Sequence, residues 1–491
     1  MRSGGWYIVR MPGHSAPQNS RSRHRRLRLN GGWALFALLA GGSLAGGAAF
    51  AAAQNETTPV VAASATAPTP RATSTVPVPQ RRPQPTTAAA PTIVRTCSVD
   101  ALASAAGLGT FQGTIRDAAS GSILFDRDGD TFSRTASVMK VLTSAAALTV
   151  LGPDYRVTTT VLKGEQGGEV VLVGGGDVTL ASGTSNIYND SASMLELADQ
   201  VKAAWAADPA TAGSAISTIT LDSSLFTGDT WQPSWDRVEQ TEGSTAEVTA
   251  LMVDGDRSNP SADTSPRSDD PVARAGQAFK AALGSVAVGA RLGEGAAPAG
   301  AASLGAVQSA PVSTMVQEAV LRSDNTEAEM LARLTAIKRG AGSSFTSLQA
   351  AIPAALSEAY GLDAAGLVIV DGSGLSDDDA VSAEFITALL DRVNARDGSL
   401  GVLLDGLPIA DQTGTLSYRF TGANSVVNGR VFAKTGSIDS ANTLAGVIHA
   451  ADGSVLTFAF FALNSQLGSG REALDALTVG VYNCGNALSN N

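Results

Sequence analysis

A proline-rich stretch decides where in this chain a folded body can begin. Eight of the 20 prolines lie within residues 55–95, among many threonines, alanines and valines. Proline at this density favours an extended polyproline II chain and leaves too little apolar surface for a core. Residues 54–96 are therefore predicted to be a linker, and a folded body is expected from residue 97 onward.

The segment before the linker has the order of an export signal. Residues 1–30 contain a cluster of five arginines, and residues 31–53 are mostly apolar and small. A basic segment followed by an apolar one is typical of a signal peptide or a membrane anchor with its basic side in the cytoplasm. Residues 31–53 are just long enough to span a bilayer, and Ala51 and Ala53 before Gln54 fit a cleavage site. Either interpretation exports the rest of the chain, and the linker favours a tethered protein over one secreted after cleavage near Ala53.

The net charge of −11 combines two segments of opposite sign. Residues 1–96 hold eleven arginines and a single acid, Glu56, which makes them +10, whereas the remainder carries −21. An acidic body of this kind repels the phosphate backbone of nucleic acids. We therefore expect no nucleic-acid partner.

Histidine and cysteine are too scarce for several kinds of catalytic centre. The histidines are His14, His24 and His449, and the cysteines are Cys97 and Cys484. These counts argue against zinc and iron–sulfur sites and against a Ser–His–Asp triad, since only His449 lies in the predicted body. An all-carboxylate metal site stays open, but the sequence predicts no metal and no cofactor.

The two cysteines stand at the two ends of the predicted body. Outside the cytoplasm, a pair of cysteines tends to form a disulfide. A bridge between Cys97 and Cys484 is therefore predicted, with two unrelated buried thiols as the alternative. Such a bridge closes nearly the whole body into one loop.

The order of predicted elements indicates an α+β fold. Two strands near the start of the body, helices in the middle, and three strands and a helix at the end suggest one antiparallel sheet whose edge is the N-terminal hairpin. The expected strands cover 111–116, 122–126, 429–433, 443–449 and 454–461, and the expected helices include 136–151, 312–321, 327–338, 348–360, 383–394 and 471–482. Residues 154–304 have a β-rich and loop-rich pattern of their own, and we interpret them as an inserted module.

One candidate site lies at the start of the helix predicted from residue 136. Ser137 and Lys140 are three residues apart, so their side chains share a helix face. The positive end of the helix dipole depresses the pKa of a nearby lysine, and a neutral lysine can take the serine proton without any histidine. The S-x-x-K pattern alone is common, and its plain alternative is an ordinary cap followed by a solvated lysine.

Two further short motifs follow later in the chain. Ser323-Asp324-Asn325 falls between two predicted helices, and Lys434-Thr435-Gly436 falls at the end of a predicted strand. Taken alone, the first motif is equally consistent with an ordinary capping loop, and the second with a strand terminus followed by a turn glycine. Together with S-x-x-K, in this order and context, they resemble the three motifs of penicillin-binding proteins and serine β-lactamases.

Other segments make the resemblance narrower. The 185 residues between Ser137 and Ser323, the Gly-Gly-Gly-Asp run at 174–177 and the Asp-Gly-Ser-Gly-Leu-Ser run at 371–376 are similar to D-Ala-D-Ala carboxypeptidases of peptidase family S13, the class C low-molecular-mass penicillin-binding proteins. The resemblance covers residues 97–491. It implies a transpeptidase fold formed by 97–153 and 305–491, with a sheet flanked by helices and a helical subdomain, into which 154–304 are inserted. Asp377 and Asp379 replace the usual arginine and asparagine, which leaves the local bridge of that arginine in doubt.

The resemblance implies a role for each motif residue. Ser137 becomes the nucleophile, Lys140 the general base, and Ser323 and Asn325 relay protons and position the lysine and substrate. Lys434 and Thr435 bind the substrate carboxylate, and Gly436 lets the substrate backbone lie along the strand. The backbone N–H groups of Ser137 and Ser437 form the oxyanion hole.

The implied substrate is a peptidoglycan stem peptide ending in D-Ala-D-Ala, with penicillins as covalent inhibitors. Two alternatives remain open at this point. A class A β-lactamase needs a Glu-x-x-Leu-Asn element after S-D-N, and no glutamate between Ser323 and Lys434 has asparagine four residues later. A non-catalytic cell-wall-binding protein with decayed motifs is disfavoured because all three motifs are intact.

Overall fold

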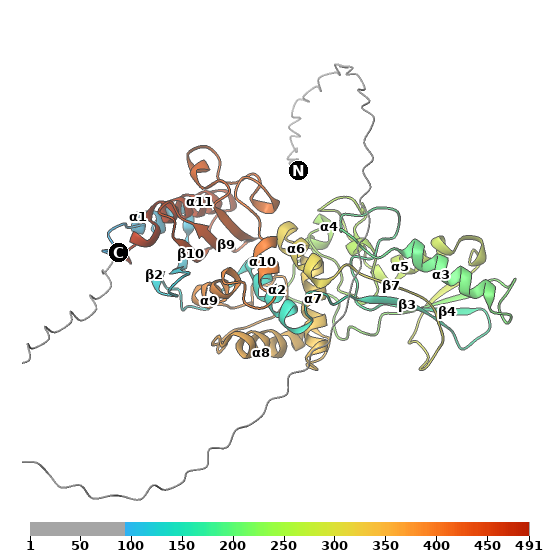
Figure 1. The fold of residues 1–491 in the computed structure, drawn as a ribbon. Helices are drawn as coiled ribbons and strands as arrows, with labels where there is room; N and C mark the ends of the chain where they lie inside the picture. Colours follow the sequence, from blue (N-terminus) through green and yellow to red (C-terminus); the bar gives the residue numbers. More distant parts are fainter. Residues whose placement is uncertain (1–93, 491) are drawn as a thin grey trace, which may run out of the picture. The chain divides into compact units, whose positions relative to one another are not determined.

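The computed structural model describes residues 94–490, and Figure 1 shows how their helices and strands are arranged. The predicted segments 1–30 and 31–53, and all but the last residues of the linker, lie outside the described residues. Among the helices that the structure does describe, we find none with the length and apolar character needed to cross a membrane.

The first sheet joins the two ends of the described chain. Its strands are β1 (Thr110–Asp117), β2 (Ile123–Arg127), β8 (Val431–Ile438), β9 (Ala441–His449) and β10 (Val455–Leu463). The order is β2-β1-β10-β9-β8, and every pairing is antiparallel. This confirms the predicted antiparallel sheet with the N-terminal hairpin at one edge.

Strand β10 shows why this sheet is covered on both sides. Alternate residues of a strand point to opposite faces. Phe458 and Phe460 pack in one apolar cluster with α11 (Leu467–Cys484), while Phe461 packs in another with α9 (Ala383–Asn394). In Figure 1, α11 and the short α1 (Asp100–Ala103) lie on one side of the sheet and α9 lies on the other.

The helical part of the fold surrounds one buried helix. Helix α2 (Met139–Val150) contacts α6, α7 and α8, and all its residues from Met139 to Leu148 are buried. Its alanines let the neighbouring helices approach closely. The surrounding helices are α6 (Val312–Arg322), α7 (Asn325–Lys338), α8 (Leu348–Tyr360) and α10 (Gly401–Gly406).

A second sheet lies in the segment predicted as the inserted module. It contains β3 (Thr158–Lys163), β4 (Glu169–Val173), β5 (Thr218–Asp222), β6 (Arg291–Glu294) and β7 (Ser303–Gln308), in the order β6-β5-β4-β3-β7. Pairs β4–β5 and β5–β6 are parallel, and α3 (Met194–Ala207) and α5 (Pro271–Leu283) pack against the sheet. The short α4 (Val238–Glu242) lies between β5 and α5 in sequence. The sequence pattern predicted strands over 156–163, 169–174 and 215–222 but not β6 or β7, and β7 extends past residue 304.

Short 3₁₀ turns connect several of these elements. They are η1 (Ala106–Leu108), η2 (Ala136–Val138), η3 (Asp254–Asp256), η4 (Gly284–Val286), η5 (Phe345–Ser347), η6 (Gly414–Leu416), η7 (Gly422–Val427) and η8 (Gly485–Ala487). Turn η2 leads directly into α2, so the predicted helix from 136 to 151 begins with a tighter turn than expected.

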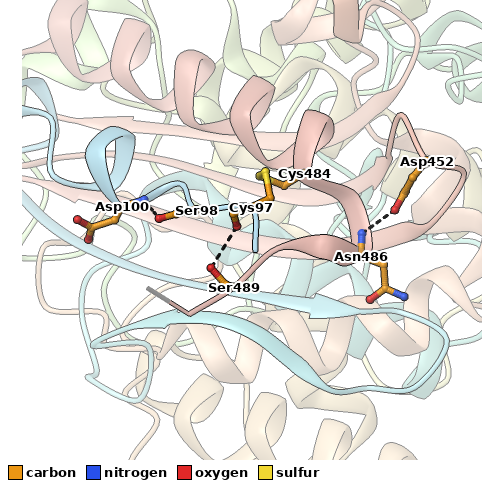
Figure 2. Close-up of a disulfide and its surroundings, with 7 residues drawn as sticks. All are labelled: Cys97, Ser98, Asp100, Asp452, Cys484, Asn486 and Ser489. Carbon is orange, nitrogen blue, oxygen red and sulfur yellow. Dashed lines mark hydrogen bonds between the residues drawn. A yellow bond between two sulfur atoms is a disulfide. The ribbon is translucent and has the colours of Figure 1, made fainter. Parts of the chain in front are cut away.

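The disulfide between Cys97 and Cys484 is present, which confirms the predicted pairing. Figure 2 shows the bridge beside the C-terminal residues, where the Ser489 hydroxyl donates to the Cys97 carbonyl. The Cys97 N–H donates to the Ala487 carbonyl at 3.0 Å, and the Ser489 N–H donates to Cys97 at 2.9 Å. The chain ends are therefore joined by backbone hydrogen bonds as well as by sulfur.

Candidate active site

Ser137 lies in η2, at the point where the chain enters α2. The residue before it, Ala136, has a φ of 45°, in the left-handed region that an L-residue with a Cβ seldom adopts. Such backbone strain persists where the surrounding packing holds it, and it is common at active sites. The turn places Ser137 half-buried at the wall of a cleft.

Lys140 is fully buried and donates three hydrogen bonds. Its Nζ lies 2.9 Å from Ser137 Oγ, 2.6 Å from Asn325 Oδ1 and 2.8 Å from the Ser373 carbonyl. Burial lowers the pKa of Lys140 to about 8, although the carboxylates of Asp371 and Glu329 act in the opposite direction. The lysine is thus close enough to a neutral state to accept a proton from the serine that it contacts.

The Ser323-Asp324-Asn325 motif joins α6 to α7. Ser323 ends α6 with a φ of 63°, and Asp324 caps α7 by accepting the Glu327 N–H. Asn325 is the first residue of α7, and its Nδ2 donates to the Ser244 carbonyl at 3.1 Å. The resemblance implied that Ser323 and Asn325 both act near Lys140. In the structure Asn325 contacts Lys140, while Ser323 Oγ accepts from Lys434 Nζ at 2.9 Å.

The Lys434-Thr435-Gly436 motif lies inside β8, where the sequence placed it at a strand end. Strand β8 continues to Ile438 and is the outermost strand of its sheet, so this edge borders the cleft. Burial, together with the positive charge of Lys140, lowers the pKa of Lys434 well below its usual value. The Thr435 hydroxyl donates to Thr415 Oγ1 at 2.8 Å.

Gly436 allows β8 to approach the nucleophile. A Cβ added there overlaps the Thr443 Oγ1 of β9 and lies 2.9 Å from the Ala136 Cβ and 3.0 Å from the Ser137 nitrogen, so a larger residue clashes with both β9 and η2. The next residue, Ser437, lines the same cleft as Ser137. The resemblance assigns the oxyanion hole to the backbone N–H groups of these two residues.

Residues of the 154–304 segment contact the Ser323-Asp324-Asn325 motif, although no sequence motif predicted these contacts. Arg257 forms an ion pair with Asp324 at 2.6 Å, and both side chains are at most 3% exposed. Tyr188 donates to the same carboxylate at 2.9 Å. Burial alone raises the pKa of Asp324, but Arg257 and Arg267 outweigh it and hold the pKa below its usual range. Because these partners are far apart in sequence, no spacing rule detects them.

Asp377 and Asp379, the two departures from the resemblance, have separate partners. Asp377 accepts a hydrogen bond from the Ser440 hydroxyl. Asp379 is buried and accepts from the N–H groups of Val370 and Asp371 at 2.8 and 3.3 Å. Burial and the neighbouring Asp371 raise the pKa of Asp379 well above its usual value. This loop is therefore held without the arginine that the resemblance leads one to expect.

Several of these residues line a cleft of about 640 Å³ that is open to solvent. Its walls come from the helices, from β8 and from the inserted module, and include Ser137, Ser323, Asn325, Thr435, Gly436, Ser437, Arg257, Arg267, Thr415 and Tyr418. Within residues 94–490, no group of three or more His, Cys, Asp and Glu side chains is arranged to hold a metal ion.

Comparison with known proteins shows which family the sequence matches. The chain matches the D-Ala-D-Ala carboxypeptidase 3 (S13) family over residues 96–267 and 260–480. It is 38% identical over 414 residues to carboxypeptidase DacB of Mycolicibacterium smegmatis, covering 82% of this chain and 87% of the relative. It is 36% identical over 408 residues to a carboxypeptidase of Mycobacterium tuberculosis, covering 81% and 86%.

Among solved structures, the chain is similar to penicillin-binding protein 4 of Haemophilus influenzae. The TM-score is 0.63 at 19% sequence identity, over 76% of this chain and 94% of that one. At this identity the similarity establishes the fold alone.

Proposed function

The chain belongs to the D-Ala-D-Ala carboxypeptidase 3 (S13) family, and from this premise we propose that Ser137 is the nucleophile with which it cleaves peptidoglycan stem peptides. The protein is a serine-type D-Ala-D-Ala carboxypeptidase that acts outside the cytoplasm, in the cell wall. The observation that carries the role of Ser137 is its contact with a buried lysine whose pKa is lowered to about 8.

Acylation begins when neutral Lys140 takes the proton of the Ser137 hydroxyl. The serine oxygen then forms a bond to the carbonyl carbon of the penultimate D-Ala. The bond from that carbon to the nitrogen of the terminal D-Ala breaks, and the leaving nitrogen takes up the proton that Lys140 accepted from Ser137. Asn325 holds the lysine through a 2.6 Å hydrogen bond during these steps.

The wall formed by β8 binds the substrate. The N–H groups of Ser137 and Ser437 stabilise the oxyanion that forms on the attacked carbonyl. The Thr435 hydroxyl at the cleft wall binds the terminal carboxylate, with Lys434 buried beside it. The edge of β8 pairs with the extended peptide backbone. The short distance between Gly436 and η2 supports this arrangement.

Water completes the cycle by hydrolysing the ester on Ser137. A β-lactam forms the same ester, and the protein is proposed to release it slowly, as a penicillin-binding protein does and a β-lactamase does not. Rapid turnover of penicillin by the purified protein is the outcome that favours the β-lactamase alternative.

Labelling with a fluorescent penicillin tests the nucleophile. Wild type should acquire one covalent label, which peptide mapping should place on Ser137, and Ser137→Ala should acquire none. Ser285→Ala, an exposed serine in η4, serves as the matched control and should label like wild type. An unlabelled wild type, or a fully labelled Ser137→Ala, contradicts the proposal.

Product analysis defines the reaction further. Purified protein should release D-alanine from a pentapeptide that ends in D-Ala-D-Ala. Parallel incubation with cross-linked muropeptides measures how far the same acyl-enzyme chemistry extends to cross-links. Ser137→Ala should give neither product.

We also propose that residues 31–53 tether the enzyme to the membrane and that residues 54–96 form its stalk. The order of basic, apolar and proline-rich segments supports this proposal. Fractionation of cells that express the full chain should find it in the membrane fraction, with the basic end protected from external protease. Recovery of a soluble form beginning near Gln54 contradicts the tether.

A further inference from the structure

Glu329 is a buried carboxylate that the proposed acylation step does not use. It lies on α7, one turn after Asn325, so the two side chains share a helix face. Asn325 contacts Lys140 directly. Glu329 is fully buried, and its partners are backbone N–H groups of the loop that also contacts Lys140.

The hydrogen bonds form a continuous path from Glu329 to the lysine. Both Glu329 oxygens accept from the Gly372 N–H at 3.0 Å, and Oε1 also accepts from the Ser373 N–H at 2.8 Å. The carbonyl of Ser373 in turn accepts from Lys140 Nζ at 2.8 Å. One peptide segment therefore connects the carboxylate to the general base.

The same segment is held from the opposite side by α2. The Thr143 hydroxyl donates to the Gly372 carbonyl at 2.6 Å. A Cβ at residue 372 meets the Cβ of Ala332 and the carbonyl of Ala328, so glycine lets this segment lie directly on α7. The segment is thus hydrogen-bonded to α2 on one side and to α7 on the other. We therefore expect the Ser373 carbonyl to shift only if one of these contacts, such as that of Glu329, is altered.

Several charged groups act on Lys140 and Glu329. Burial and the nearby Asp371 raise the pKa of Glu329 to about 8, while Arg333, one turn further along α7, acts in the opposite direction. Glu329 in turn is one of the carboxylates that raise the pKa of Lys140 against the effect of burial. The charged groups around Lys140 and Glu329 are Asp324, Asp371, Asp379, Arg333 and Lys434.

We propose that Glu329 is a positioning residue for the general base: it fixes the Gly372–Ser373 segment so that the Ser373 carbonyl holds Lys140 against Ser137, and when ionised it supplies negative charge next to that lysine. This role rests on the proposed function, because it assumes that Lys140 is the base. It adds a residue of α7 outside the three motifs to the groups on which acylation depends.

Glu329→Gln tests the proposal because it keeps the shape of the side chain and removes its charge and one acceptor. The measured quantity is the rate constant for acylation by a fluorescent penicillin, per folded molecule, as a function of pH. We expect the highest rate constant to fall by about ten- to a hundredfold as the base loses its orientation. Since a carboxylate that raises the pKa of Lys140 is lost, the rise in rate should also move to lower pH.

Two further variants complete the experiment. Glu358→Gln changes an exposed glutamate on α8 that pairs with Arg339, and it should leave both the rate and the pH profile unchanged. Glu329→Asp keeps the charge but shortens the reach, so its pH profile should stay near that of wild type while its rate falls. It also serves as the test if Glu329→Gln does not fold.

A wild-type rate and an unmoved profile in Glu329→Gln overturn the proposal. If Glu329→Gln does not fold, a wild-type acylation rate in Glu329→Asp overturns the proposal instead. A lower rate without any movement of the profile in Glu329→Gln also contradicts it, because a merely structural role lowers the rate alone. If wild type itself is not acylated, the proposed function fails, which is a different result.

Discussion

Two lysines occupy the buried site, and their surroundings give them different tasks. Lys140 has carboxylates nearby that keep its pKa at about 8 despite full burial. Lys434 has Lys140 as its charged neighbour, which adds to the effect of burial and lowers its pKa further. Lys140 contacts Ser137 Oγ, whereas Lys434 contacts Ser323 Oγ, so only Lys140 is placed to take the proton of the nucleophile.

From the surroundings of this one residue, Lys140, we predict how the rate of acylation depends on pH. Lys140 acts as a base only when neutral, so the acylation rate constant should rise about tenfold per pH unit below about 8 and level off above it. Stopped-flow measurement with a fluorescent penicillin, with circular dichroism as a check on folding at each pH, provides the profile. Lys140→Ala should fold and not acylate at any pH. A flat profile, or normal acylation by that variant, contradicts the assignment of the base.

At the scale of elements, residues 154–304 contact the segments that carry the second motif and the loop beside Lys140. Arg257 pairs with Asp324 at the start of α7, and the Ser244 carbonyl accepts from Asn325. The Trp235 Nε1 donates to Asp371 in the loop that contacts Lys140, at 2.8 Å. The segment that separates the first two motifs in sequence thus returns to hold the second motif and this loop in place.

Arg257→Met should therefore destabilise the protein and slow acylation. Removing one partner of a buried ion pair leaves an unpaired charge, which costs roughly 3–5 kcal/mol in the free energy of unfolding. Urea unfolding near neutral pH measures this loss. Since pairing holds the pKa of Asp324 below its usual range, the stabilisation is present above the ordinary carboxyl pKa and lost as the pH falls through the lowered value.

A matched control for this variant is available on the surface. Arg339 pairs with Glu358 in an exposed position, so Arg339→Met should change the free energy of unfolding by at most about 1 kcal/mol. Equal stability losses in the two arginine variants would show that the Arg257 pair has no special role in the fold.

At the scale of the whole molecule, the last strand and the disulfide close the body. Strand β1 pairs with β10 from Thr110–Leu463 to Asp117–Leu456, and the Cys97–Cys484 bridge spans 387 residues of sequence. Both features join the start of the body to its end. The N-terminal hairpin therefore completes a sheet whose other strands, β8, β9 and β10, come from the C-terminal end of the chain and are synthesised last.

Cys97→Ser/Cys484→Ser should be less stable than wild type by roughly 2–5 kcal/mol, because the bridge restricts the unfolded chain. Urea unfolding measures the difference, and wild type treated with reductant should behave like the double variant. Penicillin acylation at low temperature should persist, since neither cysteine lines the cleft. An unchanged free energy of unfolding contradicts a stabilising role for the bridge.

The sequence by itself determined the family, the antiparallel sheet, the disulfide and the pair Ser137 and Lys140. Helical spacing is a local property, so two residues three apart share a face wherever the chain forms a helix. The tertiary structure alone decided that Ser323 contacts Lys434, that Arg257 holds Asp324, and that Glu329 reaches Lys140 through Ser373. These contacts join residues from different elements, most of them far apart in sequence, and they form only when packing buries polar groups that must then find partners.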